Sequence, residues 1–435
     1  MQQKAGILGM LMMMISPLLW GQDKVTTYHD AEETIVKESY SRVNNQPHGE
    51  YALYYEDGTL AQTGRFVSGK KEGRFVDFFP ASTDTLKITT YQNNLKEGPS
   101  HTFFRNGQVS QEVNYVANQL QGWIRQFDEA GNLIKETQFE ADQPHGESIS
   151  YHENGEIQEK SQYQNGLLHG SLKRYFDSGK LEGEANYEQG ELDGLFVTYY
   201  PDGSVASRQE YKNGTKEGPL VSYHENGELQ KKGQYRKGRE NGEFIEYYDN
   251  KQVFRKVNFK NGTVQGKIET FYASGKPLEQ MQYDNKGRLI KIETFYESGQ
   301  RKQFIPFVEG REHGEAIFYH ENGKIKEKTS FQNGLKSGLT EKFDESGIRT
   351  HSHAYREGML TGPTITYYPN GKPQNSTYFV RGKKEGTYQE FDREGKVIRS
   401  GKYSNNLQVG DWISFDGEGE IINREVYRSG EKLDK

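Results

Sequence analysis

A 24-residue repeat constrains this chain more than any other feature of its sequence. Gly146, Gly170 and Gly194 begin three successive copies, and in each copy a tyrosine stands five residues after the glycine. A turn ending in glycine follows, then a second aromatic residue, then another turn. Asn-Gly and Asp-Gly between β-prone runs are strong hairpin signals, because glycine accepts the positive φ that such turns need. The repeat therefore predicts strand, turn, strand, turn, and an all-β chain.

The phase of the repeat can be counted along most of the chain. Sixteen copies begin from residue 49 onward, and fifteen of them begin with glycine. The starts are 24 residues apart, except that the second copy carries one extra residue in the turn at 81–85. Every copy has Tyr or Phe five residues after its start (the first aromatic) and a second aromatic about twelve residues later. The starts are Gly49, Gly73, Gly98, Gly122, Gly146, Gly170, Gly194, Gly218, Gly242, Gly266, Ile290, Gly314, Gly338, Gly362, Gly386 and Gly410.

One copy buries too little apolar surface to fold by itself, so neighbouring copies must supply hydrogen bonds and ring packing. In most copies an aliphatic residue stands six residues before the second aromatic, such as Ile157 before Tyr163. Even spacing along a strand places side chains on one face. We therefore expect the two aromatics and the aliphatic residue to share one face of an elongated, single-layer antiparallel sheet of consecutive β-hairpins.

The two ends of the chain differ from the repeat array. Residues 1–21 have one lysine and a short apolar run, which is typical of a secretory signal peptide with cleavage near Gly21, or of an uncleaved membrane anchor. Export to the periplasm, the cell surface or the medium is expected. Residues 22–48 are expected to form a linker and N-terminal cap, and 49–433 the sixteen repeats. A bend is expected near 283–306, where Ile290 replaces the glycine and Pro306 interrupts a strand.

Composition and motifs argue against several classes of function. Lys and Arg number 56 against 62 Asp and Glu, so no basic footprint for nucleic acid is present, and the chain has no cysteine. Seven histidines recur in phase, but adjacent copies would hold them about 9.6 Å apart, too far to share a metal ion. No catalytic motif or pocket-forming insertion appears. The chain is expected to be a non-enzyme that needs no cofactor or metal.

A second row of aromatic residues stands one residue after the first aromatic. Tyrosine offers contact area at low entropy cost, so this row is a candidate interaction face for a peptide, a glycan or a lipid interface. The alternative is a second structural stripe, packed with residues two after each starting glycine, such as Phe75, Phe196 and Trp412. The candidate residues are Tyr55, Phe104, Phe176, Tyr200, Tyr248, Tyr272, Tyr296 and Tyr368.

The segment from Tyr187-Glu-Gln-Gly190 through Tyr199-Tyr-Pro-Asp-Gly203 resembles the MORN repeat, and more closely the variant found in YwqK-like antitoxin proteins. The resemblance covers about residues 49–430. It implies an elongated single-layer sheet of hairpins and a role in scaffolding or protein binding. The leading hypothesis is a non-enzymatic exported scaffold that binds a protein or a cell-envelope component. The alternatives are a lipid- or glycan-binding surface protein, and an antitoxin or immunity protein of a toxin–antitoxin system.

Overall fold

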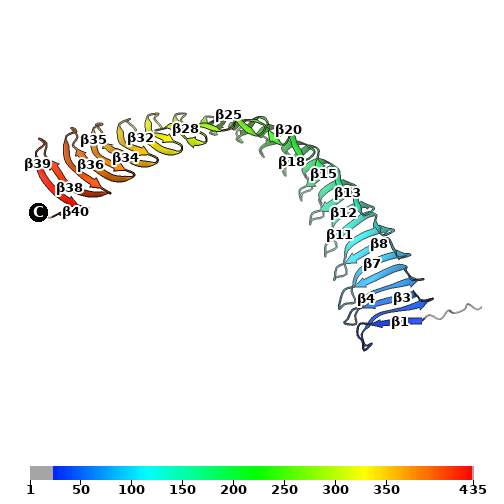
Figure 1. Cartoon of the computed structure of the whole chain (residues 1–435). Helices are drawn as coiled ribbons and strands as arrows, with labels where there is room; N and C mark the ends of the chain where they lie inside the picture. The colour runs from blue at the N-terminus through cyan, green and yellow to red at the C-terminus, as the bar shows by residue number, and fades with distance from the viewer. Residues whose placement is uncertain (1–22, 434–435) are drawn as a thin grey trace, which may run out of the picture. The chain divides into compact units, whose positions relative to one another are not determined.

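The computed structural model of the chain describes residues 23–433, and all regular structure in this range is β-strand. The predicted signal peptide, residues 1–21, lies outside the described residues. No helix between residues 23 and 433 is long and apolar enough to span a membrane. Consecutive strands pair antiparallel in chain order, as Figure 1 shows. The predicted single-layer sheet of β-hairpins is confirmed.

The strands fall into two compact parts. The N-terminal part comprises residues 23–193 and 201–203. Its strands are β1 (Asp23–Tyr28), β2 (Val36–Val43), β3 (Gln46–Tyr54), β4 (Leu60–Val67), β5 (Lys70–Lys71), β6 (Gly73–Phe78), β7 (Thr85–Gln92), β8 (Leu95–Phe103), β9 (Val109–Val116), β10 (Gln119–Leu120), β11 (Gly122–Phe127), β12 (Leu133–Glu140), β13 (Gln143–Tyr151), β14 (Ile157–Gln164), β15 (Leu167–Tyr175), β16 (Leu181–Glu188) and β17 (Glu191–Leu192).

The C-terminal part comprises residues 194–200 and 204–433. Its strands are β18 (Gly194–Tyr199), β19 (Val205–Lys212), β20 (Thr215–Tyr223), β21 (Leu229–Arg236), β22 (Arg239–Glu240), β23 (Gly242–Tyr247), β24 (Val253–Lys260), β25 (Thr263–Phe271), β26 (Pro277–Tyr283), β27 (Leu289–Phe295), β28 (Arg301–Val308), β29 (Arg311–Glu312), β30 (Gly314–Tyr319), β31 (Ile325–Gln332), β32 (Leu335–Phe343), β33 (Arg349–Arg356), β34 (Met359–Tyr367), β35 (Pro373–Val380), β36 (Lys383–Phe391), β37 (Val397–Ser404), β38 (Leu407–Phe415), β39 (Ile421–Arg428) and β40 (Glu431–Leu433).

Each repeat contains two different turns, which lie on opposite edges of the sheet. After the first aromatic, the His152 N–H donates to the Glu156 carbonyl (2.8 Å), and Gly155 takes a φ of 85°. This first turn is a three-residue hairpin loop that ends in a left-handed glycine. After the second aromatic, Asn165 and Gly166 have φ values of 51° and 83°, which define a two-residue type I′ turn. Both predicted turns are therefore hairpin turns.

Where a repeat starts with glycine, that glycine marks a β-bulge, as at Gly146. Gly146 has a φ of 97°, and the register of β12 against β13 shifts between Thr137 and Phe139, opposite this glycine. Ile290 needs no glycine, because the hairpin before it closes differently: the Asp284 N–H donates to the Arg288 carbonyl, in the manner of a first turn. Through the region 283–306, β26, β27 and β28 stay paired, with Lys291 opposite Pro306.

The prediction that both aromatics of a repeat share one face with the aliphatic residue is wrong. Phe75, two residues after Gly73, packs against the second aromatics Phe66 and Tyr91, with ring centroids 5.7 and 5.1 Å apart. A first aromatic is an odd number of residues from this position, so it lies on the other face. The prediction assumed that residues an even number apart share a face. This rule holds only within one regular strand, and a bulge and a turn lie between the two aromatics.

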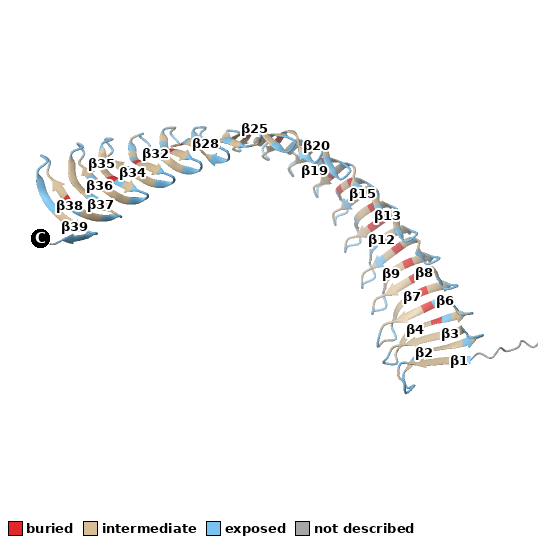
Figure 2. Ribbon diagram, viewed as in Figure 1, coloured by how far each residue is buried: buried red, intermediate tan, exposed pale blue. Residues whose placement is uncertain are grey.

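Both faces of the sheet contain buried residues, which lie mid-strand between exposed turns (Figure 2). On the face of the second aromatics, Phe75 and Trp412 are 1% and 2% exposed. On the other face, Ile245 is 6% exposed. Side chains on a one-layer sheet can be buried only by their neighbours on adjacent strands, so burial here depends on the presence of flanking repeats.

Residues 22–48, expected as a linker and cap, contribute two strands to the sheet. Asp23 pairs with Arg42 and Tyr28 with Val36, the same register in which Gly49 pairs with Phe66 and Tyr54 with Leu60. Seven residues lie between Tyr28 and Val36, whereas five lie between Tyr54 and Leu60, so this turn is two residues longer. This copy was not predicted from the repeat, because aspartate stands in place of its starting glycine and arginine in place of its second aromatic.

Candidate interaction site

The eight aromatic residues of the candidate interaction face are all half-buried, and six of them are tyrosines with the same hydrogen bond. Each hydroxyl donates to the backbone carbonyl that lies 23 residues further along, at the first aromatic of the next repeat. The bonds are Tyr55 to Phe78 (2.9 Å), Tyr200 to Tyr223 (2.7 Å), Tyr248 to Phe271 (2.8 Å), Tyr272 to Phe295 (2.9 Å), Tyr296 to Tyr319 (2.9 Å) and Tyr368 to Phe391 (2.8 Å).

Histidine makes the same contact where it replaces tyrosine. The Nε2 atoms of His152, His224 and His320 lie 2.8, 2.9 and 2.9 Å from the corresponding carbonyl oxygens. His29 does the same to the Tyr54 carbonyl at 3.0 Å, from the longer turn of the N-terminal copy. A carbonyl oxygen only accepts hydrogen bonds, so Nε2 carries the proton in each case. These in-phase histidines thus connect neighbouring repeats.

Phenylalanine and aspartate at this position use other contacts. Phe104 and Phe176, the remaining two candidates, have no hydroxyl to donate. Asp128 and Asp416 instead accept hydrogen bonds from residues of their own turns. The Asn132 side chain lowers the pKa of Asp128, and the Glu420 N–H lowers that of Asp416.

A row of asparagines joins the first turns to one another. The Asn154 side-chain amide donates to the Asp177 carbonyl (2.7 Å), and Asn226 donates to Asp249 (3.0 Å). The Oδ1 atom of Asn154 also accepts the N–H of Glu156, two residues further along. Asn106, Asn250, Asn322 and Asn370 make the equivalent contacts. These asparagines therefore join six pairs of neighbouring first turns.

On the edge formed by the second turns, several of the residues just before a starting glycine bond to the next second turn. The carboxylates of Glu97, Glu217 and Glu385 accept the first N–H of the next second turn, at 2.8, 2.7 and 2.8 Å. His48 is placed in the same way, with Nδ1 3.3 Å from the Ser68 nitrogen. His145 lies 3.6 Å from Glu140.

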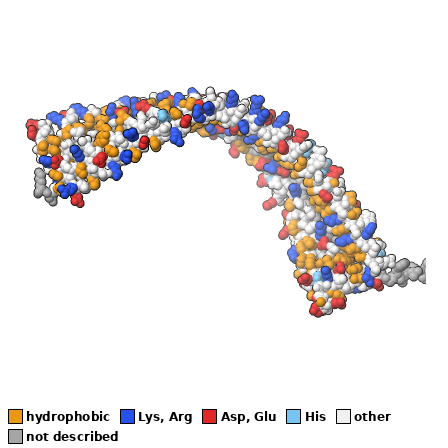
Figure 3. All heavy atoms as spheres, viewed as in Figure 1, with side chains coloured by type: hydrophobic (Ala, Val, Ile, Leu, Met, Phe, Trp, Pro, Cys, Tyr) orange, Lys and Arg blue, Asp and Glu red, His pale blue; other side chains and the backbone are white. Residues whose placement is uncertain are grey.

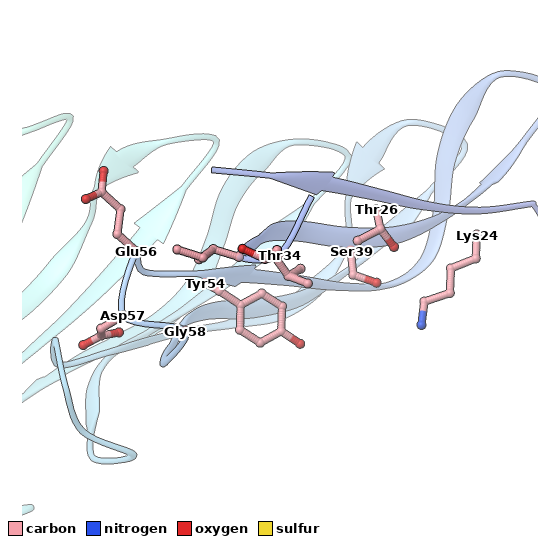
Figure 4. A pocket seen from close by; sticks show the side chains of 10 residues that line it. Lys24, Thr26, Thr34, Ser39, Tyr54, Glu56, Asp57 and Gly58 are labelled. Atoms are coloured by element: carbon pink, nitrogen blue, oxygen red, sulfur yellow. The ribbon is translucent and has the colours of Figure 1, made fainter. Parts of the chain in front are cut away.

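Hollows in the surface are shallow. One hollow of about 640 Å³ lies beside the turn that joins β1 to β2. Figure 4 shows the Tyr54 ring at its middle, with Lys24 and Asp57 toward its two ends. Another, of about 540 Å³, is lined by residues that include His145 and His169. Nowhere between residues 23 and 433 do three His, Asp or Glu side chains gather in a way that could hold a metal ion.

Exposed aliphatic side chains flank five consecutive second turns of the C-terminal part. They are between 42% and 53% exposed. We call these residues the turn-edge row, and they are Val308, Leu335, Met359, Val380 and Leu407. Hydrophobic side chains also gather over the strands near the C-terminus in Figure 3. Sequence reasoning missed the row because the aliphatic residue precedes the turn in some repeats and follows it in others, so it does not recur at one phase.

The chain is similar, at low sequence identity, to parts of several solved structures. Structures of TcdB2-TccC3-TEV and TcdB2-TccC3-Cdc42 are each 12% identical over 90% and 93% of this chain, with TM-scores of 0.14 and 0.12. A pore of the Photorhabdus luminescens Tc holotoxin is 11% identical over 94%, with a TM-score of 0.11. The chain spans 24%, 27% and 30% of those chains, and likeness at this level carries no argument.

No curated protein sequence matches the chain. A sequence profile of the MORN repeat variant does match it, in ten segments that together cover half of its residues. The segments are 47–67, 144–165, 168–189, 192–213, 216–237, 240–261, 264–285, 312–333, 360–380 and 384–405. Each spans a hairpin of the kind described above. This chain belongs to the MORN repeat variant family.

Proposed function

We propose that this protein is a non-enzymatic, exported scaffold that binds a protein or another component of the cell envelope along its sheet. The proposal is carried by a difference between two groups of side chains. Residues that recur in phase, such as Tyr248, Asn154 and Glu217, bond to the neighbouring repeat. Other residues, such as Leu335 and Tyr378, are exposed, and the residue type at their position changes from one repeat to the next. A partner would be recognised by the second group.

The alternative of a glycan- or lipid-binding tyrosine face is less well supported. A glycan surface needs ring faces and free hydroxyls, whereas the hydroxyls of Tyr55, Tyr200 and four others are already donated to backbone carbonyls. The rings remain half-buried. An antitoxin role is a further alternative, but no contact in the described residues favours it.

Site-directed photo-cross-linking in the native cells tests the scaffold proposal. A photoreactive phenylalanine analogue is placed at exposed, non-recurring positions (Leu335, Leu339 and Tyr378), and at half-buried Tyr175 as a matched control. We expect one discrete adduct from the exposed positions and much less from the control. Fractionation of the same cells locates the protein. The proposal fails if no exposed position gives an adduct, or if the protein stays in the cytoplasm.

A further inference from the structure

The hollow of about 640 Å³ beside the turn that joins β1 to β2 lies on the face of the sheet that carries Tyr54 (Figure 4). Its volume is within the range of small-ligand sites, about 300–1,000 Å³. We call it the N-terminal hollow. The lining residues on which the argument depends are Lys24, Thr26, Ile35, Ser39, Tyr54 and Glu56.

Small side chains at two opposite positions create the hollow. Thr26 of β1 lies directly opposite Ser39 of β2. In the repeat that begins at Gly122, the same two places are taken by Arg125 and Glu136, which form an ion pair at 3.1 Å. Long side chains thus occupy this face elsewhere in the N-terminal part. The hollow is therefore a property of Thr26 and Ser39, and the fold does not require it.

The hydroxyl of Tyr54 lacks the partner that an equivalent tyrosine has. Tyr151 stands at the same place of its own repeat, and its hydroxyl donates to the Glu136 carboxylate at 2.9 Å. Beside Tyr54 that place belongs to Ser39, whose side chain is shorter, and the Tyr54 hydroxyl bonds to no residue between 23 and 433. In Figure 4 it points toward the end of the hollow where Ser39 and Lys24 lie. A ligand could take the place of the missing carboxylate.

Two fixed turns form the walls of the hollow. On one side, the Asp30 carboxylate accepts the N–H groups of Thr34 and Ile35 (3.0 and 2.7 Å), which holds Ile35 at the rim. The Thr34 side chain and the Ile35 N–H lower the pKa of Asp30 to about 2, so these bonds persist at neutral pH. On the other side, Asp57 accepts the Thr59 N–H at 2.8 Å. The walls thus keep their shape without a ligand.

The same places of another repeat line a second hollow, of about 480 Å³, in the C-terminal part. Ser400 takes the place of Ser39, and Phe415 takes that of Tyr54. This hollow has fewer free polar groups, because Phe415 has no hydroxyl and the Lys396 amino group donates to a backbone carbonyl of the neighbouring turn. Of the two, the N-terminal hollow offers a ligand the larger set of hydrogen-bonding groups.

The groups that face the N-terminal hollow suit a sugar better than a peptide. The hydroxyls of Thr26, Ser39 and Tyr54 can each donate and accept a hydrogen bond, as sugar hydroxyls do. The Tyr54 ring offers an apolar surface on which the C–H groups of a sugar ring can pack. Peptides are commonly bound through their backbone at the edge of a sheet, whereas the backbone groups of these strands lie in the plane of the sheet.

The charges at the two ends of the hollow have opposite signs. Figure 4 shows Lys24 at one end, and Glu56 with Asp57 at the other. Neither Lys24 nor Glu56 forms an ion pair with any residue between 23 and 433. A carboxylate of the ligand would pair with Lys24, and a second one at the far end would be repelled. Glu56 only accepts hydrogen bonds, so it suits ligand hydroxyls.

We propose that the N-terminal hollow binds a short oligosaccharide that carries a carboxylate at one end. A central sugar ring packs on Tyr54, and its hydroxyls bond to Thr26 and Ser39. The carboxylate pairs with Lys24, and hydroxyls at the opposite end bond to Glu56. This inference goes beyond the proposed function, because it adds a ligand site in the N-terminal part that does not depend on a partner protein.

Calorimetric titration of the full chain tests the proposal. The probes are three disaccharides with one carboxylate each: glucuronosyl-xylose, glucuronosyl-N-acetylglucosamine and N-acetylglucosaminyl-N-acetylmuramic acid. The comparison ligands are the methyl ester of each probe, digalacturonate with a carboxylate on both rings, and the peptide Gly-Ser-Ser-Glu. We expect at least one probe to bind at least tenfold more tightly than every comparison ligand, and its binding to weaken as salt rises.

Substitutions test whether the hollow is the site. Ser39→Gln fills it without adding charge, and glutamine already stands at the equivalent place as Gln280, so the melting temperature should not change. We expect this variant to raise the Kd of the best probe at least tenfold. Lys24→Gln should raise it several-fold and remove the preference for the acid over its methyl ester. The matched control, Ser376→Gln at the same place of a repeat in the C-terminal part, should leave the Kd unchanged.

Four outcomes would overturn the proposal. They are no binding of any probe, equal binding of a probe and its methyl ester, tighter binding of the peptide, and an unchanged Kd in the Ser39→Gln variant. Tighter binding of the peptide would assign the hollow to a protein segment. The photo-cross-linking experiment reports on positions of the C-terminal part, so the scaffold function and the carbohydrate site can each fail without the other.

Discussion

The indole ring of Trp412 lies directly over the Cα of Gly401 on the neighbouring strand, in the space that a Cβ at residue 401 would occupy. Phe75 covers Gly64 and Phe244 covers Gly233 in the same way. In each case the ring stands two residues after a starting glycine, and the covered glycine belongs to the preceding repeat. None of the three covered glycines needs a left-handed φ, so what they provide is room for the ring.

Gly401→Ala should therefore destabilise the C-terminal part. Because the new methyl group would overlap the Trp412 ring, we expect a loss of about 1–3 kcal/mol, as for other overpacked cores. Urea unfolding followed by circular dichroism measures the loss. Gly417→Ala is the control, since nothing lies within 4 Å of its Cβ position. In a Trp412→Leu background the cost of Gly401→Ala should largely vanish, and an unchanged cost there would refute the steric explanation.

The tyrosine hydroxyls should stabilise the sheet by joining repeats. Tyr248→Phe leaves the Phe271 carbonyl without its donor and should cost about 0.5–1.5 kcal/mol. The reverse change, Phe104→Tyr, supplies a hydroxyl toward the Phe127 carbonyl and should stabilise by up to about 1 kcal/mol. Thermal unfolding of both variants beside the unsubstituted protein tests the pair. If the two changes have the same sign, the hydrogen bond is not what stabilises this edge.

Replacing an alanine in a type I′ turn by asparagine should stabilise the protein. Ala117 holds a φ of 49°, a left-handed conformation that asparagine tolerates better than alanine. Ala117→Asn should stabilise by about 0.5–1 kcal/mol, and Asn165→Ala should destabilise by a similar amount. The midpoints of urea unfolding of the two variants and the unsubstituted protein measure these changes. A gain from both substitutions, or from neither, would contradict this account of the turns.

Stability of the C-terminal part should fall as the solution becomes acidic. Burial, together with the charges of His351, Lys342 and Lys336, lowers the pKa of His353, while Glu327 acts weakly in the opposite direction. The unfolded chain then binds a proton more readily than the folded chain, so this contribution is complete above about pH 6.5 and is lost as the pH falls below it.

Threonine occupies the place of His353 in the neighbouring repeats, at Thr329 and Thr377. His353→Thr should therefore fold normally and lose less stability between pH 7.5 and pH 5.0 than the unsubstituted protein does. Hydrogen exchange of the β33 and β34 amides at the two pH values measures the difference locally. An identical pH dependence in the variant would show that His353 is not the group responsible.

The hairpins were predictable because their signals are local. Asn165-Gly166 specifies its turn without reference to the rest of the chain, and 24-residue spacing repeats that signal. The faces of the sheet were not predictable by counting, since a bulge beside Tyr151 changes which residues point the same way. The copy at 23–43 was missed because Asp23 and Arg42 replace the residues that set the phase.

The site was harder to predict than the fold. Tyr248 and His224 recur in phase because their polar atoms bond to the next repeat, so recurrence identified structural residues. The turn-edge row depends on alternation between the two sides of a turn, as at Met359 and Val380. A search for exposed residues on either side of the second turns, rather than for a fixed position, would have found it.

The six tyrosine hydroxyls and the Nε2 atoms of His152, His224 and His320 reach a carbonyl 23 residues away, and His29, whose turn is two residues longer, reaches one 25 residues away. Whole 24-residue modules could thus be deleted or duplicated while every remaining hydroxyl still finds an acceptor, and length could evolve by recombination within the gene. An insertion of another size in a strand would disturb only the contacts that span it, because donors and acceptors in later repeats keep their spacing. The array is therefore tolerant of changes in copy number, and an irregular insertion would weaken one junction between repeats rather than the whole array.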